Sequence, residues 1–145
     1  MVSLEQLEAL DLLVWFRSGT AAATHGLCDQ SSITRRVQAV LKVFGLQLQR
    51  RHELELIGHT DLLRLQRVVH QHARFQGQRP LRLEATHYIR AQISAPPVAG
   101  WLLGPCHHRG YGTLLSLLEE RVIDAWITSD LQDLPDGQRL SLIHI

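Results

Sequence analysis

The sequence has few cysteines, no long apolar runs and almost no net charge. Its 145 residues, enough for one domain or for a small domain plus part of another, contain two cysteines and carry a formal charge of +1. Cys28 and Cys106 form no disulfide framework, so nothing indicates an oxidising compartment. No apolar run is long enough to cross a bilayer, and the first residues lack the basic patch and apolar segment of a signal peptide. We therefore expect a cytoplasmic protein without a membrane partner.

Signatures of catalysis are missing as well. The sequence has no nucleophile elbow, no phosphate-binding loop and no pair of motifs with zinc-ligand spacing. Cys106 with His107 and His108 is the nearest approach to a metal site, and we interpret it as a surface loop because no second ligand pair accompanies it. We expect no enzyme, no cofactor and no bound metal.

The charge is unevenly distributed along the chain. From Ser31 to Arg51 the sequence has five basic residues and no acidic one. A local cationic stretch can attract phosphate even when the whole chain is nearly neutral. Such runs are often only solvated surface, so the interpretation depends on the spacing of the residues.

Three helices are predicted before this stretch ends. Ser3 and Gln6 form a capping-box pattern in front of a helix that reaches about Arg17. A short second helix is expected over residues 21–26, with Thr20 as its cap. The third covers residues 30–44, between Asp29 as its cap and Gly45 past its last turn.

The third helix is strongly two-sided. One face is apolar: Ile33, Val37, Val40, Leu41 and Phe44. The opposite face is polar: Ser31, Arg35, Gln38 and Lys42. We expect the apolar face to pack on the first two helices and the polar face to meet a partner.

Two short strands and a fourth helix follow. Residues 46–48 and 54–56 predict a hairpin, or wing, that turns around residues 51–53. The fourth helix is expected from Thr60 or Asp61 to about Phe75, and its histidines His70 and His72 are expected to face solvent. Its apolar stripe consists of Leu62, Leu65, Val68, Val69 and Phe75. So small a domain cannot cover the whole stripe, so a partner helix is the simplest solution.

The pattern changes after the polar linker 76–80. Strands are expected over 81–85, near 98–103 and over 122–127, with a helix over 114–120. This alternation predicts the opening of an α/β domain with a parallel sheet whose core is incomplete. We assign Trp15, Trp101, Trp126 and the small Cys28 to the core. Residues 140–145 look like a non-native tail.

The stretch from Ser18 to Arg51 contains a serine, a threonine and an alanine pair, a run that starts the third helix, and a closing glycine, leucine and arginine. These residues are Ser18, Thr20, Ala22, Ala23, Gln30 to Arg35, Gly45, Leu48 and Arg51. The pattern resembles, without a gap, the DNA-binding domain of LysR-type transcription regulators. Residues 119–127 look like the family's strand with a buried aspartate, here Asp124. Gly26 stands where the family usually has a leucine, and this departure predicts a loss of core volume.

The resemblance implies a mainly α chain with four parts. These are a winged helix-turn-helix (1–59), a long linker and dimerisation helix (60–76), a truncated effector-binding α/β domain of the periplasmic-binding-protein kind (77–139) and the probable non-native tail (140–145). The implied partners are double-stranded DNA, a second or further copies in a homodimer or homotetramer, and a small-molecule co-inducer in the intact protein. Thr86 and His87, at the end of the first strand of the α/β part, are the nearest candidates for effector contact.

The chemistry of the residues indicates how DNA would be read. Gln30 can bond adenine and Arg35 can bond guanine through two hydrogen bonds each, while Ser31, Ser32 and Thr34 suit a base or a phosphate. The candidates for phosphate contact are Thr20, Arg36, Gln38, Lys42, Arg50 and Arg51.

Three alternatives stay open from the sequence. The chain could be a helix-turn-helix protein of another kind, such as a transposase arm. It could be a small hydrolase that uses a serine or cysteine with one of its nine histidines. It could also be a fragment without function.

Overall fold

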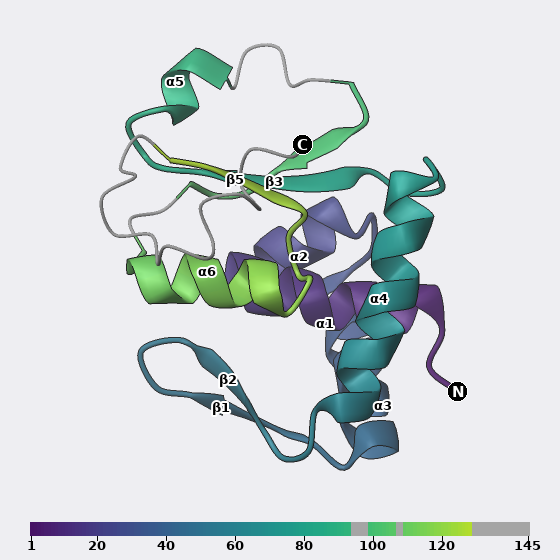
Figure 1. The fold of residues 1–145 in the computed structure, drawn as a ribbon. Coiled ribbons are helices and arrows are strands. Elements are labelled where there is room, and N and C mark those ends of the chain that lie inside the picture. The colour runs from purple at the N-terminus through teal and green to yellow at the C-terminus, as the bar shows by residue number, and fades with distance from the viewer. Residues whose placement is uncertain (94–98, 107–108, 129–145) are drawn as a thin grey trace. The chain divides into compact units, whose positions relative to one another are not determined.

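The structure of the chain is a computed structural model, and it describes residues 1–93, 99–106 and 109–128 (Figure 1). The chain divides into two compact units, residues 1–70 and 71–145. The boundary falls inside a helix, α4 (Asp61–Phe75), whose bounds agree with the predicted fourth helix.

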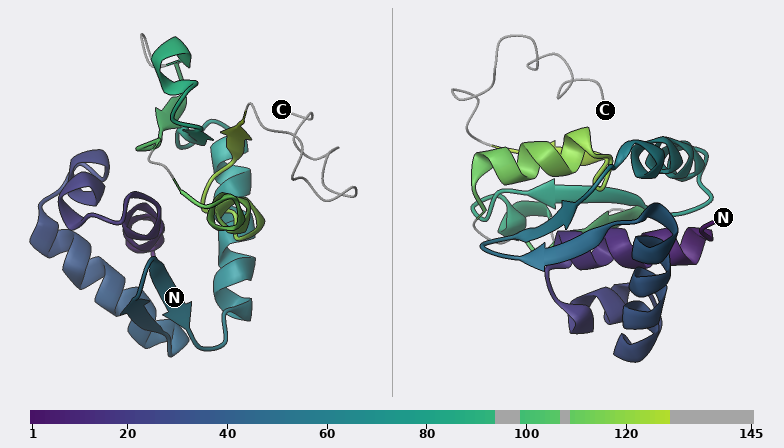
Figure 2. Two further views of the ribbon diagram at one scale, coloured as in Figure 1. Left: turned by 90° about the vertical axis from the view of Figure 1, so that its left-hand side faces the viewer. Right: turned by 90° about the horizontal axis from the view of Figure 1, so that it is seen from below.

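Three helices and a hairpin make up most of the first unit. They are α1 (Leu4–Phe16), α2 (Gly19–His25), α3 (Gln30–Phe44), β1 (Gln47–Arg50) and β2 (Leu54–Ile57). The three helices contact one another, and Figure 2 (left) shows α2 and α3 joined by a tight turn with α1 seen end-on beside them. Their shared core includes Leu7, Leu10, Trp15, Ala22 and Ile33, all at most 1% exposed.

The helix starts follow local capping chemistry. Ser3 and Gln6 form the predicted capping box on α1, and Asp29 caps α3 by accepting a hydrogen bond from the Ser32 backbone. The prediction for α2 was wrong: its cap is Ser18, whose Oγ accepts a hydrogen bond from the Ala21 backbone at 3.2 Å. Because Ser18 has an extended backbone, Thr20 becomes part of the helix instead of its cap.

The wing forms where the sequence predicts it. β1 and β2 are antiparallel, and Arg50 pairs with Leu54, which leaves residues 51–53 as the turn. Each strand extends further along the chain than predicted, to Arg50 and to Ile57.

The two sides of α4 differ from what its apolar pattern suggests. The buried side carries Leu63, Arg67, His70 and Arg74, while the large apolar residues Leu62, Leu65, Val69 and Phe75 are 62–66% exposed. At about 100° per residue the two sets lie on opposite faces of the helix. The expectation that His70 faces solvent was therefore wrong, because His70 shares the side of Leu63 and Arg67; His72 is exposed as expected.

The second unit contains a small parallel sheet. Its described elements are β3 (Leu81–Ala85), α5 (Arg90–Ile93), β4 (Trp101–Leu103), α6 (Tyr111–Glu119) and β5 (Ala125–Ile127). β3 lies between β4 and β5 and is parallel to both, as the alternating pattern predicts. The helix starts earlier and the last strand later than predicted, and Val98 lies outside the described residues.

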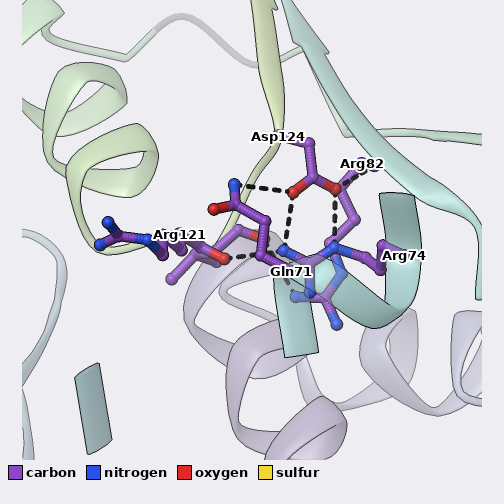
Figure 3. Close-up of polar contacts among 6 residues, drawn as sticks. Gln71, Arg74, Arg82, Arg121 and Asp124 are labelled. Carbon is purple, nitrogen blue, oxygen red and sulfur yellow. Dashed lines mark hydrogen bonds and ion pairs between the residues drawn. The ribbon is translucent and has the colours of Figure 1, made fainter. Parts of the chain in front are cut away.

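A buried carboxylate organises this unit (Figure 3). Asp124, whose side chain is 0% exposed, accepts two hydrogen bonds of 2.7 Å from the Arg74 guanidinium, one from Nε and one from Nη2. It also accepts the Gln71 amide at 3.2 Å and the Arg82 backbone N–H at 2.9 Å. The end of α4 is thereby fixed to β3 and to the start of β5, and the predicted buried aspartate is confirmed.

Cys106 is 1% exposed, so the surface-loop interpretation was wrong for it. Its backbone N–H donates to the buried Glu84 carboxylate at 2.9 Å. Burial, followed by the nearby Glu84 charge, raises the pKa of the Cys106 thiol to about 11. His107, His108 and the tail 140–145 lie outside the described residues.

The remaining predictions for buried side chains are met in part. Trp15 and Trp126 are buried, whereas Trp101 and Cys28 are only half-buried.

Within ranges 1–93, 99–106 and 109–128, no helix has the length and apolar character needed to span a membrane. In the same ranges no cluster of histidine, cysteine, aspartate and glutamate could hold a metal ion.

Candidate nucleic-acid interface

The polar side of α3 is an open surface of the first unit. Its exposed residues recur every three or four positions: Gln30, Ser31, Thr34, Arg35, Gln38 and Lys42. On the other side Ile33, Val37 and Val40 are at most 3% exposed and pack in the helical core. The core thus fixes the direction in which the polar side chains project.

A short hydrogen-bond network fixes the start of this helix. The Asp29 carboxylate accepts from the Ser32 backbone at 2.7 Å, from the Ser32 hydroxyl at 2.9 Å and from the Ser31 hydroxyl. These bonds, that of the Ser31 hydroxyl first, hold the pKa of Asp29 well below its usual value, so the carboxylate stays ionised. Arg35 joins the network through Nη2, which donates to the Ser32 hydroxyl oxygen at 3.1 Å.

This network limits what the two serines can offer. Because both hydroxyl hydrogens are directed to Asp29, Ser31 and Ser32 present acceptor lone pairs to a ligand in this arrangement. An acceptor suits a base amino group better than a phosphate oxygen. Thr34 is similarly occupied, since its hydroxyl donates to the Gln30 carbonyl at 3.1 Å.

Gln30 lies against the start of α2. A Cβ placed on Gly19 would be 3.0 Å from the Gln30 Nε2 and 3.3 Å from its Cγ. The absent side chain of Gly19 therefore makes room for Gln30, and it brings the first turns of α2 and α3 together. Thr20, in the first turn of α2, is exposed beside this contact.

Arg36 is positioned differently from Arg35. It is half-buried, and its Nη1 lies 3.7 Å from the Cys28 sulfur in the α2–α3 connection. Lys42, Arg50 and Arg51 are exposed, so their charges are more available to a ligand.

An ion pair between the end of α1 and the turn of the wing adds two residues that sequence reasoning missed. The Arg17 Nη1 and the Glu53 Oε1 are 2.8 Å apart, and the Arg17 carbonyl accepts a hydrogen bond from Arg50 at 3.2 Å. Arg17 and Glu53 lie 36 positions apart, so only the course of the chain brings them together. Opposite charge is the one signal that the sequence offers for this pair.

The two candidate effector residues belong to the second unit. Thr86 directly follows β3, and its backbone N–H donates to the Ile127 carbonyl at 3.0 Å. Its buried hydroxyl oxygen has no hydrogen-bond partner among the described residues. His87 is exposed, with its ring centroid 6.0 Å from that of Tyr88.

Of the comparisons with known proteins, the comparison with solved structures finds similar proteins. No protein-family model matches the sequence, and no curated protein matches it. LysR-type transcription regulators are among the solved structures that it resembles. CrgA from Neisseria meningitidis is 19% identical with a TM-score of 0.44 over 92% of this chain and 51% of that protein.

Two further LysR-type regulators give similar values. ArgP from Mycobacterium tuberculosis is 19% identical with a TM-score of 0.45 over 93% of this chain and 51% of that protein. DarR from Vibrio fischeri, solved in complex with DNA, is 17% identical with a TM-score of 0.42 over 94% and 54%. This chain spans about half the length of each of these regulators.

Proposed function

We propose that this chain is the amino-terminal part of a LysR-type transcription regulator and that α3 binds double-stranded DNA in the major groove. The observation that carries the proposal is the division of α3 into a core face and an open polar face that begins at a capped helix end. An α-helix fits the major groove, and residues near its amino end reach the base edges.

The residues of this surface divide into two roles. Gln30 and Arg35 would read bases, supported by the acceptors of Ser31, Ser32 and Thr34. The others would contact phosphates and position the protein: Thr20, Arg36, Gln38, Lys42, Arg50 and Arg51. Binding DNA in this way involves no catalysis.

The exposed apolar side of α4 supports dimerisation. Leu62, Leu65 and Val69 are 64–66% exposed and lie on one helix face, which a second copy of the helix would cover. A two-fold dimer presents two α3 helices to a pseudo-palindromic site. A homotetramer would combine two such dimers.

The second unit would begin the effector-binding domain. Residues 60–76 would be the linker helix, and residues 77–139 the first part of an α/β domain of the periplasmic-binding-protein kind. The buried Thr86 hydroxyl, together with His87, is the best candidate for contact with a small-molecule co-inducer. The protein would act in the cytoplasm, where its DNA is found.

A binding experiment with matched variants tests the proposal. Duplexes are selected from a random pool with the wild-type chain, and their affinities are then measured by fluorescence anisotropy at several salt concentrations. Arg35→Ala is expected to weaken binding to the selected duplex about 10- to 100-fold and to relax the preference at one base pair. Arg79→Ala removes the same charge from an exposed loop outside the surface and is expected to bind like the wild type.

The outcomes separate the alternatives. Equal losses for Arg35→Ala and Arg79→Ala would contradict the assignment of α3. Binding without selection of any sequence would contradict base reading by Gln30 and Arg35, and no binding at all would contradict DNA recognition.

A further inference from the structure

The backbone of Arg17 has a conformation that favours glycine. Arg17 ends α1 with φ 56° and ψ 14°, in the left-handed region, and its N–H donates to the Leu13 carbonyl at 2.8 Å. Residues with a Cβ are disfavoured there, and glycine is the usual choice at such a helix end. An arginine in this position accepts a backbone strain that a glycine would avoid.

The Arg17 side chain reaches the wing. The Arg17 guanidinium is paired with Glu53 in the hairpin turn at 2.8 Å, and the Arg17 carbonyl accepts from Arg50 Nη2 at the end of β1 at 3.2 Å. The turn is closed by the Arg51 N–H, which donates to the Glu53 carbonyl at 3.1 Å. One residue thus holds both sides of the turn.

We propose that the pair Arg17 and Glu53, here the wing clamp, fixes the hairpin turn against the end of α1 so that Arg50 and Arg51 meet DNA phosphates. This inference rests on the proposed function. α1 packs on α3, so its end is a fixed reference for the recognition helix. A three-residue turn that is already fixed loses little conformational freedom when DNA binds. Glu53 is a positioning residue because its carboxylate would itself repel phosphate.

The wing clamp and simple charge repulsion predict opposite effects of Glu53→Gln on DNA affinity. If Glu53 acted only as a negative charge near DNA, Glu53→Gln would strengthen binding. The clamp predicts that Glu53→Gln weakens binding about two- to fivefold, the range expected for loss of one partly exposed ion pair. It also predicts that the plot of log affinity against log salt concentration becomes less steep by about one to two, because Arg50 and Arg51 lose their contacts with phosphates.

Glu55→Gln is the matched control. Glu55 is exposed in β2 of the same hairpin, opposite Gln49, and its substitution removes the same charge. We expect Glu55→Gln to bind DNA as well as the wild type or better. Equal effects of the two substitutions would overturn the clamp.

Arg17→Gly separates positioning from stability. Glycine relieves the left-handed backbone, so this variant is expected to melt at or above the wild-type temperature. Its DNA affinity and salt slope are nevertheless expected to fall as in Glu53→Gln. A variant that keeps wild-type binding would overturn the clamp.

A measurement on the free protein distinguishes failure of the clamp from failure of the proposed function. Amide hydrogen exchange at Arg51 reports the turn without DNA and is expected to be faster in both Glu53→Gln and Arg17→Gly than in Glu55→Gln. Unchanged exchange would overturn the clamp even if the wild type binds DNA. A wild type that binds no DNA would overturn the proposed function and the wing's role in it, even with faster exchange.

Discussion

Arg67 and Asp11 form a buried ion pair that joins α4 to α1. Arg67 Nη2 and Asp11 Oδ1 are 2.8 Å apart, and the two side chains are 2% and 0% exposed. Nε of the same arginine donates to Oδ1 at 2.9 Å. Such a pair is sensitive to removal of one partner, which leaves a buried charge without its counter-charge.

Asp11→Leu is therefore expected to destabilise the first unit by about 3–5 kcal/mol. The double variant Asp11→Leu with Arg67→Met replaces the pair by apolar side chains and is expected to recover most of this loss. Urea unfolding followed by tryptophan fluorescence, with Trp101 and Trp126 replaced by phenylalanine in every variant so that Trp15 alone reports, measures both. A single variant within about 0.5 kcal/mol of the wild type would show that the pair is not buried in solution.

The second unit has a corresponding dependence on Asp124. Asp124→Asn removes the charge that pairs with Arg74 and an acceptor from a carboxylate with four hydrogen-bond donors. A loss of about 3 kcal/mol is expected, with faster amide exchange in β3 and β5. Asp61→Asn, an exposed position on α4, is the control. Equal exchange in the two variants would contradict the role of Asp124.

Dimerisation should depend on the exposed side of α4. The wild type is expected to sediment as a dimer, and Leu65→Glu as a monomer with an unchanged circular dichroism spectrum, because a buried leucine contributes roughly 1.5–3 kcal/mol per copy. Leu27→Glu is the control, since Leu27 is 93% exposed in the α2–α3 connection. A wild-type monomer at high concentration would count against this interface.

The two cysteines should differ in reactivity. Burial raises the pKa of Cys106 to about 11, so at neutral pH we expect one thiol, that of the half-buried Cys28, to react quickly in the folded protein and two after unfolding. The raised pKa also links stability to pH. Its contribution is complete below the ordinary value of 9.0 and is lost as the pH rises towards 11.

The difference in unfolding free energy between wild type and Cys106→Ala, measured from pH 8 to pH 11, isolates this contribution. It should shrink by roughly 1–3 kcal/mol over that range. A constant difference would mean that the thiol is not shielded in solution.

Elements with strong local signals could be predicted from the sequence. α3 has the bounds expected for it, because Asp29 and Gly45 mark both ends chemically and the apolar spacing is regular between them. The predicted cap of α2, Thr20, was wrong because Ser18, two positions earlier, is an equally good capping residue. Which of the two serves as the cap depends on where the backbone changes from extended to helical after α1, and this change follows Ser18.

Features that depend on distant residues could not be predicted. The buried side of α4 contains Arg67 and Arg74, whose burial depends on Asp11 and Asp124. The hydrophobic pattern of the helix therefore pointed to the face that the single chain leaves exposed. The pairing of Arg17 with Glu53 depends on topology in the same way.

The expected loss of volume at Gly26 also did not occur. A Cβ built there would be 3.0 Å from the Ala22 carbonyl oxygen and 3.4 Å from the Ile33 Cδ1. Neighbouring groups have closed over the position, so the connection between α2 and α3 is tight without a larger side chain. Composition alone could not show this adjustment.

Gly45 constrains how α3 and the hairpin that follows it could diverge in evolution. It ends α3 at φ 64°, and nothing lies within 4 Å of a Cβ built on it. An alanine there would be strained by the positive φ, and relief of that strain by one more helical residue would turn the following chain by about 100°. Because the buried Leu46 follows directly, such a turn would carry it out of the core, so a single base change at this codon would alter the direction of the hairpin and the stability of the first unit together.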